Sequence, residues 1–417
     1  MNIQKQKRLL YLLELTSNFS LTGGAWIIFL AQRGFSLFEI AVGETFFHIV
    51  SFLAEIPSGA AADLWGRKKT MLISQLCFIL SVPCYIFAYD LPLLMLAMGL
   101  TALGYNFNSG TRSALTYDSL LQCGKEEEYL KVSADQRFLY SISSMLASLC
   151  TGIVGKIGYV LGNLGDLCFN LTSAAIIGGL TEPTVTENQK NRQKLSLRTM
   201  GSQIWQQFSC RFAFLKGNPT IAVRMFLDAC IGCCDTLTVF FLQQHFSESG
   251  ASFALIGILL VIVQIGGMAG TRVAPLLAKR LRFGKMMILC SAGAVFALVT
   301  AGSTLPILSA AGGFFLRGFG LLSETVTSDS INRDLPSDQR ATLISVGSIM
   351  FSTAMIGATP LLGALSDSVG TARAFPVLGL VLAGIAAAIL LFGKKAFFAE
   401  KYPDRRVSHW KTRRFFV

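Results

Sequence analysis

Long apolar runs alternate with short polar intervals along almost the whole chain. A membrane-spanning helix needs about 20 mainly apolar residues, and twelve runs of that kind can be placed. They form two sets of six on either side of a polar interval: 9–31, 37–61, 70–89, 92–119, 137–159 and 162–182, then 220–243, 252–278, 286–303, 305–331, 341–366 and 372–393. The pattern predicts an all-α membrane protein with twelve transmembrane helices in two six-helix halves. The run at 162–182 is the weakest, because Asn163, Asp166 and Asn170 dilute it.

The same pattern divides the chain into four parts. We expect an N-terminal half at 1–182, a linker at 183–219, a C-terminal half at 220–395 and a basic tail at 396–417. Within the linker, apolar residues recur at helical spacing among Arg, Gln and Ser. This spacing predicts an amphipathic helix that lies on the membrane surface.

The positions of the basic residues give the spans a direction. When the chain is threaded through twelve spans, 29 of its 36 Lys and Arg residues fall in segments on one side. The loops on the other side hold only Arg33, Lys156 and Arg373. Loops rich in Lys and Arg stay in the cytoplasm. We therefore expect a protein of the cell membrane with both termini in the cytoplasm.

Composition agrees with this class and excludes others. Hydrophobic residues make up 52% of the chain and charged residues 14%, whereas soluble domains carry about 25% charged residues. The net charge of +12 is spread between the apolar runs, so we expect contact with membrane lipid and not with nucleic acid. Catalytic sets, nucleotide-binding loops and metal-spaced histidines do not appear, and His245 and His409 fall outside the apolar runs. We expect a monomer with no enzyme activity and no cofactor.

The cysteines allow two interpretations at one place. Ten are scattered along the chain, and Cys230, Cys233 and Cys234 stand together beside Asp235. This group could bind a soft metal, but cysteine in a membrane helix more often packs as a small residue. We expect no metal site.

One short run between two apolar segments is both charged and rich in glycine. It is GAAADLWGRKK, from Gly59 to Lys69. Gly59 allows close helix approach and Gly66 a tight turn, because neither has a Cβ. Arg67 is placed to reach a carboxylate of a neighbouring helix, and the topology supplies Asp118. A simpler interpretation gives the basic residues of the run only a role in orienting the chain.

The spacing G-x-x-x-D-x-x-G-R-K-K of this run resembles the loop between the second and third helices of major facilitator superfamily transporters. The resemblance implies that superfamily's twelve-helix fold and a charge network that latches the two halves together in the outward-open state. It assigns the latch to Gly59, Asp63, Gly66, Arg67, Lys68 and Asp118. The chain departs from another common signature of the superfamily in the fourth span and from the fifth-span pattern of drug–proton antiporters. Met98 stands where an arginine is expected, and the fifth span has glycines without the expected proline.

Ionisable residues within the spans are candidates for function, because a charge in the bilayer is costly. Glu44 and His48 are four residues apart on one helix and can exchange a proton or form a buried hydrogen-bonded pair. Asp235 has no basic partner nearby on its own helix. We expect proton coupling at Glu44, His48, Asp235 and Glu324.

The resemblance also implies that the first, fourth, seventh and tenth helices line a central cavity. Polar residues of these helices are therefore the expected substrate-binding residues: Glu14, Asn18, Tyr105, Asn108, Arg112 and Arg317. Three functions are considered. The first is proton-coupled efflux of small amphiphilic molecules, and the second is uptake of a small polar or anionic metabolite by symport or facilitated diffusion. The third is a transporter-like sensor, which the short loops between spans disfavour.

Overall fold

The computed structural model describes residues 1–185, 215–334 and 340–392. Within these ranges the side chains of residues 63, 332–334, 340–345, 390 and 392 are not described. The described secondary structure is helical throughout. The helices are α1 Ile3–Ser17, α2 Trp26–Gln32, α3 Leu37–Trp65, α4 Arg67–Phe87, α5 Leu91–Asn108, α6 Thr111–Leu121, η1 Glu126–Glu128, α7 Tyr129–Leu149, α8 Thr151–Ile157, α9 Tyr159–Gly179, α12 Pro219–Glu248, α13 Phe253–Ala278, α14 Phe283–Ala301, α15 Pro306–Asp334, α16 Arg340–Val369 and α17 Thr371–Phe392.

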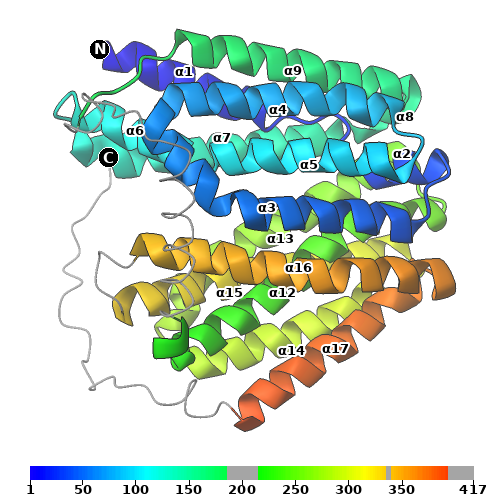
Figure 1. Ribbon diagram of the computed structural model, residues 1–417. Coiled ribbons are helices and arrows are strands. Elements are labelled where there is room, and N and C mark those ends of the chain that lie inside the picture. Colours follow the sequence, from blue (N-terminus) through cyan, green and yellow to red (C-terminus); the bar gives the residue numbers. More distant parts are fainter. Residues whose placement is uncertain (186–214, 335–339, 393–417) are drawn as a thin grey trace.

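The helices form two bundles that lie one above the other in Figure 1, with α1 to α9 above and α12 to α17 below. In the described ranges, ten continuous segments are long and apolar enough to cross a membrane. The segment from η1 to α8 is an eleventh, bent by 42° at Cys150. Together with the first span, this confirms the predicted all-α fold of two six-helix halves. The weakest predicted span is present as α9.

The first span is not the continuous helix that the sequence predicts at 9–31. Helix α1 ends at Ser17 and α2 begins at Trp26, so residues 18–25 are not helical. The interruption contains Gly23 and Gly24, and glycine is a poor helix former. The predicted linker at 183–219 and tail at 396–417 fall mostly or wholly outside the described residues.

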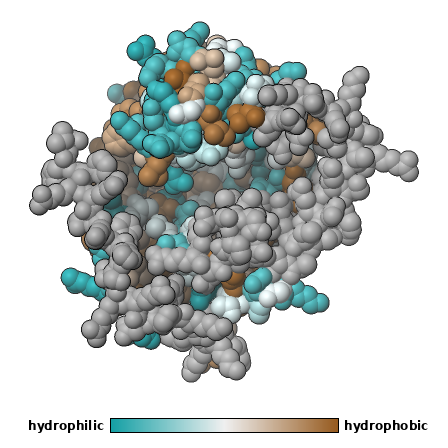
Figure 2. Space-filling model, turned by 90° about the vertical axis from the view of Figure 1, so that its left-hand side faces the viewer, coloured by the Kyte–Doolittle hydropathy of each residue, from teal (hydrophilic) through white to brown (hydrophobic). Residues whose placement is uncertain are grey.

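We call the end of the bundle where α1 and α4 begin the inner end, and the opposite end the outer end. The charge pattern predicts that the inner end is cytoplasmic. Figure 2 looks onto this inner end, where a hollow lies between the two halves.

Contacts between the halves close the outer end. The Asp367 carboxylate near the end of α16 accepts hydrogen bonds from the backbone N–H groups of Leu37 and Phe38, at 2.9 and 2.8 Å. These donors belong to the first turn of α3, where a helix favours negative charge. Helix backbones also approach closely here, because a Cβ on Gly363 would lie 2.5 Å from the Cβ of Ala41. The structure therefore represents a state that is sealed at the outer end.

Candidate functional site

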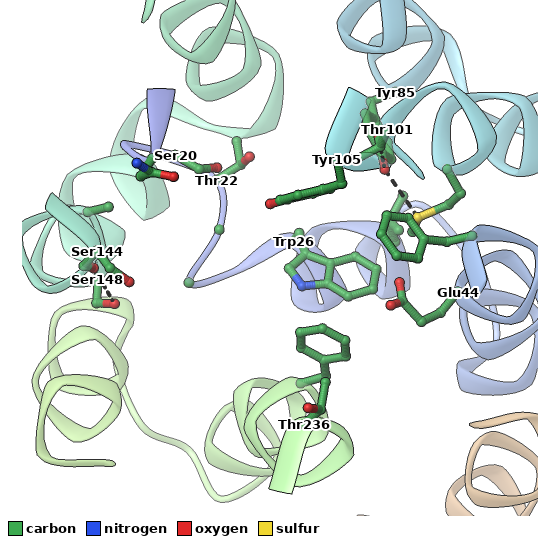
Figure 3. Close-up of a pocket in the computed structure, with 18 of the residues that line it drawn as sticks. Ser20, Thr22, Trp26, Glu44, Tyr85, Thr101, Tyr105, Ser144, Ser148 and Thr236 are labelled. Atoms are coloured by element: carbon green, nitrogen blue, oxygen red, sulfur yellow. Dashed lines mark hydrogen bonds between the residues drawn. The ribbon is translucent and has the colours of Figure 1, made fainter. Parts of the chain in front are cut away.

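A cavity of about 750 Å³ lies between the two halves. Its wall comes from the interrupted first span and from α3, α4, α5, α7, α9, α12, α13 and α16. Most of its polar lining is neutral: Asn18, Ser20, Thr22, Thr101, Ser144, Ser148, Asn163, Thr236, Gln264 and the tyrosines 85, 105, 140 and 159. Figure 3 shows Trp26, Tyr105 and Glu44 directed into the same space.

Glu44 and His48 supply the ionisable groups of this wall. The His48 Nε2 atom lies 3.4 Å from the Glu44 Oε1 atom, one helical turn away on α3. Both residues are buried. The imidazole ring packs edge-on against Phe47 and against Phe351 of α16, so it touches both halves. A carboxylate and an imidazole in contact can share or exchange a proton.

Met98, which stands where the sequence comparison leads one to expect an arginine, also lines the cavity. Its sulfur accepts a hydrogen bond from the Tyr85 hydroxyl at 3.1 Å. This part of the wall therefore carries no fixed positive charge. At the position where the superfamily signature has an arginine, the wall of this cavity therefore has an uncharged thioether.

A second cavity of about 500 Å³ lies in the C-terminal half. Thr236 and Phe351 line both cavities, so the two are adjacent. The second wall contains three acidic residues and one basic residue: Asp228, Asp235, Glu324 and Arg317. Asp228 accepts a hydrogen bond from Ser323 of α15 at 2.5 Å.

Asp235 and Arg317 form an ion pair across α12 and α15, with 2.5 Å between Oδ2 and Nη1. Asp235 lacks a basic partner nearby on its own helix, as the sequence indicates, but the fold supplies one from another helix. Its second oxygen, Oδ1, is buried without a hydrogen-bond partner. The Arg317 side chain is 29% exposed and also lines a third cavity of about 180 Å³. The pair is thus accessible from the interior space of the protein.

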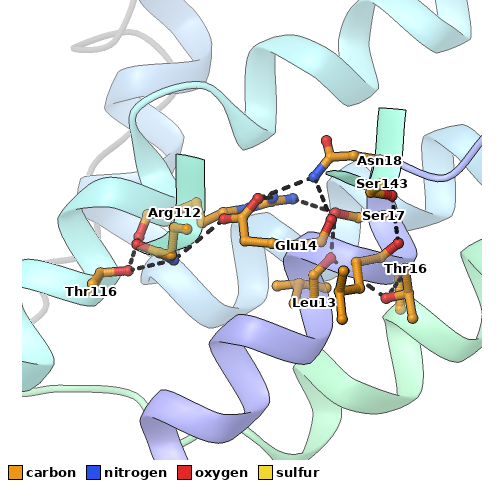
Figure 4. Close-up of polar contacts among 11 residues, drawn as sticks. Leu13, Glu14, Thr16, Ser17, Asn18, Arg112, Thr116 and Ser143 are labelled. Carbon is orange, nitrogen blue, oxygen red and sulfur yellow. Dashed lines mark hydrogen bonds and ion pairs between the residues drawn. The ribbon is translucent and has the colours of Figure 1, made fainter. Parts of the chain in front are cut away.

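The N-terminal half holds a corresponding ion pair between α1 and α6. Arg112 Nη1 lies 2.7 Å from Glu14 Oε2, and Arg112 Nη2 donates to Ser17 at 2.8 Å. Asn18 and Gln136 donate to the two Glu14 oxygens at 3.0 and 3.3 Å. Figure 4 shows this network between the first span and the neighbouring helices. Every carboxylate oxygen of Glu14 is therefore hydrogen-bonded.

The predicted inner loop brings together helices of the N-terminal half. Gly66 has φ 96°, which residues with a Cβ rarely adopt, so the expected turn is present. Arg67 Nε lies 2.9 Å from Asp118 Oδ2, and Lys68 donates to the Gly178 carbonyl at 2.6 Å. Glu182 accepts from the backbone N–H groups of Arg67 and Lys68.

Two of the residues predicted for the latch are not seen in the predicted contacts. A Cβ on Gly59 would meet no atom within 4 Å, so this glycine makes no close helix contact in this state. The side chain of Asp63 lies outside the described residues. The Arg67–Asp118 pair joins two helices of the same half, and it does not itself connect the halves.

The predicted substrate-binding residues separate into two groups. Asn18, Tyr105 and Arg317 line the described cavities. Glu14, Arg112 and Asn108 line none of these three cavities, and the first two are occupied with each other. All four predicted proton-coupling residues line a cavity.

The sequence pattern predicts no role for Glu182 or Gln136, and it marks Asp166 only as a residue that weakens a predicted span. Asp166 is buried within a predicted span and binds the interrupted segment of the first span. A polar residue inside an apolar run was the available signal. The partner could not be found from the sequence, because it lies more than 140 positions away.

Comparison of the sequence with protein-family profiles identifies one family. The sequence profile of the Major Facilitator Superfamily matches residues 9–352. No curated protein matches the chain by sequence.

Solved structures share the fold at low sequence identity. The crystal structure of the nucleoside transporter NupG has a TM-score of 0.76 and 14% identity, and covers 94% of this chain and 100% of its own. That of a D-xylose–proton symporter has a TM-score of 0.68 and 12% identity, and covers 92% and 97%. That of a POT family transporter in complex with 5-aminolevulinic acid has a TM-score of 0.68 and 14% identity, and covers 94% and 96%.

Proposed function

The chain belongs to the Major Facilitator Superfamily, and from this premise we propose that it carries small, neutral, hydroxyl-bearing solutes by alternating access. The outer end is sealed in this structure. Transport requires a second state in which the outer end opens and the inner end closes. The single observation that carries the proposal is the chemistry of the wall around the 750 Å³ cavity.

That wall combines flat aromatic rings with uncharged hydrogen-bonding groups. Trp26, Tyr105 and Phe351 offer faces for stacking. Serine, threonine, tyrosine, asparagine and glutamine side chains offer donors and acceptors on other sides. Such a site discriminates strongly in favour of solutes that satisfy its polar groups, because an unpaired buried group is costly. A nucleoside or a sugar has the matching chemistry.

Two structural neighbours are described as a nucleoside transporter and a D-xylose–proton symporter. Their TM-scores of 0.76 and 0.68 support a common fold at only 12–14% identity, and their substrates are of the class that the wall favours. This supports the uptake alternative over the efflux of amphiphiles.

Proton coupling is proposed at Glu44, His48, Asp235 and Glu324. All four face cavities, where a solute or water can reach them. Glu44 is the foremost candidate because it lies in the solute wall itself, beside an imidazole. Protonation there can be linked to solute binding through a shared cavity.

The inner loop is proposed as the latch of the alternative state. Gly59, Asp63, Gly66, Arg67, Lys68 and Asp118 lie at the inner end, which is not the end sealed here. The Arg67–Asp118 contact and the Glu182 cap hold the loop in place within its own half. Gly59 is open to approach by another helix when the halves close at this end.

The experiment is uptake of radiolabelled uridine, adenosine, D-xylose and D-glucose into proteoliposomes that contain the purified protein, with and without an inward proton gradient. We expect saturable uptake of at least one of them, raised by the gradient. The Glu44→Gln variant serves as the control for coupling. Transport of none of the four solutes overturns the proposed solute class, and equal uptake with and without the gradient overturns proton coupling.

Efflux of amphiphilic molecules is the second candidate. The aromatic side chains Trp26, Phe47, Phe240 and Phe351 all line the central cavity, and such a wall also suits an apolar solute. Ethidium in the same proteoliposomes distinguishes the two. Proton-dependent ethidium movement without uptake of any hydroxylated solute favours efflux.

A further inference from the structure

Helix α9 crosses the membrane but carries a buried carboxylate that needs an explanation. Asp166 is 8% exposed. One of its oxygens accepts a hydrogen bond from the backbone N–H of Leu21 at 2.5 Å. The other accepts from the backbone N–H and the hydroxyl of Thr22, at 3.2 and 2.6 Å, and more weakly from Ser20 at 3.4 Å. The carboxylate therefore holds the non-helical residues of the first span.

The same face of α9 is shaped for this segment. A Cβ on Gly165 would lie 2.4 Å from Leu21 Cδ1, and a Cβ on Gly162 would lie 3.0 Å from Thr22 Cγ2. One turn further along, Phe169 packs on Phe19 with ring centroids 4.6 Å apart. Positions 162, 165, 166 and 169 repeat at helical spacing, so two glycines, an acid and an aromatic ring form one cradle. Asp166, one of the residues that weaken the apolar run at 162–182, therefore has a structural role in this cradle.

The opposite side of the segment faces the central cavity. Asn18, Ser20, Thr22, Gly23 and Gly24 all belong to its wall. Non-helical backbone at membrane depth is tolerated only where it is buried in protein or lines a cavity. In other membrane transporters, interrupted helices commonly supply the binding groups. The position of the interruption thus points to a use in binding.

The segment also touches the C-terminal half, since Gln243 of α12 donates to the Gly23 carbonyl at 3.1 Å. Directly after the segment, Trp26 of α2 packs edge-on against Phe240 with centroids 5.6 Å apart. Residues 18–25 therefore both line the cavity and contact the other half.

We propose that residues 18–25 are a solute-binding segment and that Asp166 is the positioning residue that holds them. The hydroxyl protons of Thr22 and Ser20 point to Asp166, which leaves their oxygen lone pairs for other partners. The segment thus accepts hydrogen bonds from solute hydroxyl groups. This deepens the proposed function and rests on it, since it names which atoms of a sugar or ribose the wall recognises.

The test compares Asp166→Asn with Asp90→Asn in the purified protein. Asparagine is close in shape, but its amide nitrogen cannot accept hydrogen bonds, so part of the clamp is lost. Asp90 is a suitable control because it caps α5 through the Leu93 N–H, is exposed and lines none of the three cavities. Asparagine is an equally good cap.

Two readouts are needed. Without solute, we expect the backbone amides of residues 18–25 to exchange with deuterium faster in Asp166→Asn than in the wild type, and unchanged in Asp90→Asn. In transport, we expect the KM for whichever of the four labelled solutes the wild type carries to rise about tenfold, since hydrogen bonds to charged groups are of that order. The maximal rate should change by less than about twofold, the pattern expected when uniform binding is lost. A merely structural role would lower the amount of active protein and leave KM alone.

A second pair of variants tests the hydroxyl. Thr22→Val keeps the shape of the side chain and should also raise KM, whereas Thr172→Val should not, because Thr172 is exposed on α9 and bonds to its own helix. If the wild type carries any of the four labelled solutes and both Asp166→Asn and Thr22→Val retain its KM, the inference is overturned and the proposed function stands. Unchanged amide exchange in Asp166→Asn overturns the clamp. If the wild type carries none of the solutes, the binding half of the inference fails together with the proposed function.

Discussion

The two halves each bury one acid–arginine pair between corresponding helices, and the two pairs differ in what surrounds them. In the N-terminal half, Glu14 of the first span pairs with Arg112 of the fourth. In the C-terminal half, Asp235 of the seventh span pairs with Arg317 of the tenth. In the first pair both Glu14 oxygens accept further hydrogen bonds, although Arg112 Nε is buried without a partner, and neither residue lines one of the three described cavities. The second lines a cavity and leaves Asp235 Oδ1 unpaired.

The two pairs occupy corresponding positions in the halves, but their surroundings suit different roles. A buried ion pair with every oxygen satisfied is costly to disturb. A buried acceptor without a partner, beside a partly exposed guanidinium, can gain a hydrogen bond when a solute, a proton or water arrives. We infer that the N-terminal pair holds helices together and that the C-terminal pair takes part in transport.

The largest effect is expected from removing one partner of the N-terminal pair. Arg112→Met leaves the Glu14 carboxylate buried with only neutral donors, and breaking a buried pair costs about 3–5 kcal/mol. We expect little folded protein, measured as the monodisperse fraction in detergent and by thermal unfolding. The double variant Glu14→Gln/Arg112→Met removes the unpaired charge and should recover part of the loss. Normal folding and transport of Arg112→Met would contradict the structural role.

The next largest effect is expected at the C-terminal pair, and it should fall on transport. In Asp235→Asn, Arg317 remains partly exposed to the cavity, where water can solvate it. We expect near-normal thermal stability but a transport rate lower by about 10- to 100-fold, the scale of a hydrogen bond to a charged group. Proteoliposome uptake and thermal unfolding are measured side by side. A loss of folded protein equal to that of Arg112→Met would remove the contrast between the halves.

The spans could be predicted from the sequence because apolar length and the distribution of Lys and Arg are local properties. Partners across helices could not. The Asp235–Arg317 contact joins residues 82 positions apart, and spacing on one helix says nothing about which other helix faces it. Gly23 and Gly24 are a local signal for the break in the first span. The apolar residues around them nevertheless make the stretch 9–31 read as one continuous span. The groups that hold the break belong to other spans, with Asp166 of α9 and Gln243 of α12 bonded to the segment.

The predicted place of His245 was wrong for a similar reason. The apolar run ends at 243, but α12 continues to Glu248. His245 is buried, with Nδ1 2.9 Å from the Thr371 hydroxyl and Nε2 2.8 Å from the Ser303 carbonyl. Partners from another helix and from the loop between α14 and α15 allow this polar residue to be buried beyond the apolar run.

An effect of intermediate size is expected at Glu44. In the N-terminal half, the acid that we propose to bind and release protons is Glu44, and not the ion-paired Glu14. Glu44→Gln keeps the shape but cannot release a proton. We expect loss of gradient-driven accumulation, while exchange of labelled for unlabelled solute continues at a rate within about threefold of the wild type. Asp135→Asn is a control, because this carboxylate binds Tyr11 away from the three cavities. Accumulation that survives in Glu44→Gln would assign coupling to the C-terminal acids instead.

The smallest effect is expected at Gly59, where the halves differ in their inner loops. The first-half loop keeps an acid and a glycine, whereas the corresponding run LAKRLRFGKM of the second half has no acid. A Cβ at Gly59 meets no atom here, and neither does one at Gly357 of α16. Both Gly→Ala changes should therefore raise or preserve thermal stability, since alanine is the better helix former. Only Gly59→Ala should slow transport, by about threefold, because the added methyl group obstructs helix approach when the inner end closes. Equal transport rates for the two variants would show that Gly59 remains open throughout the cycle, and the latch would then depend on the charged residues alone.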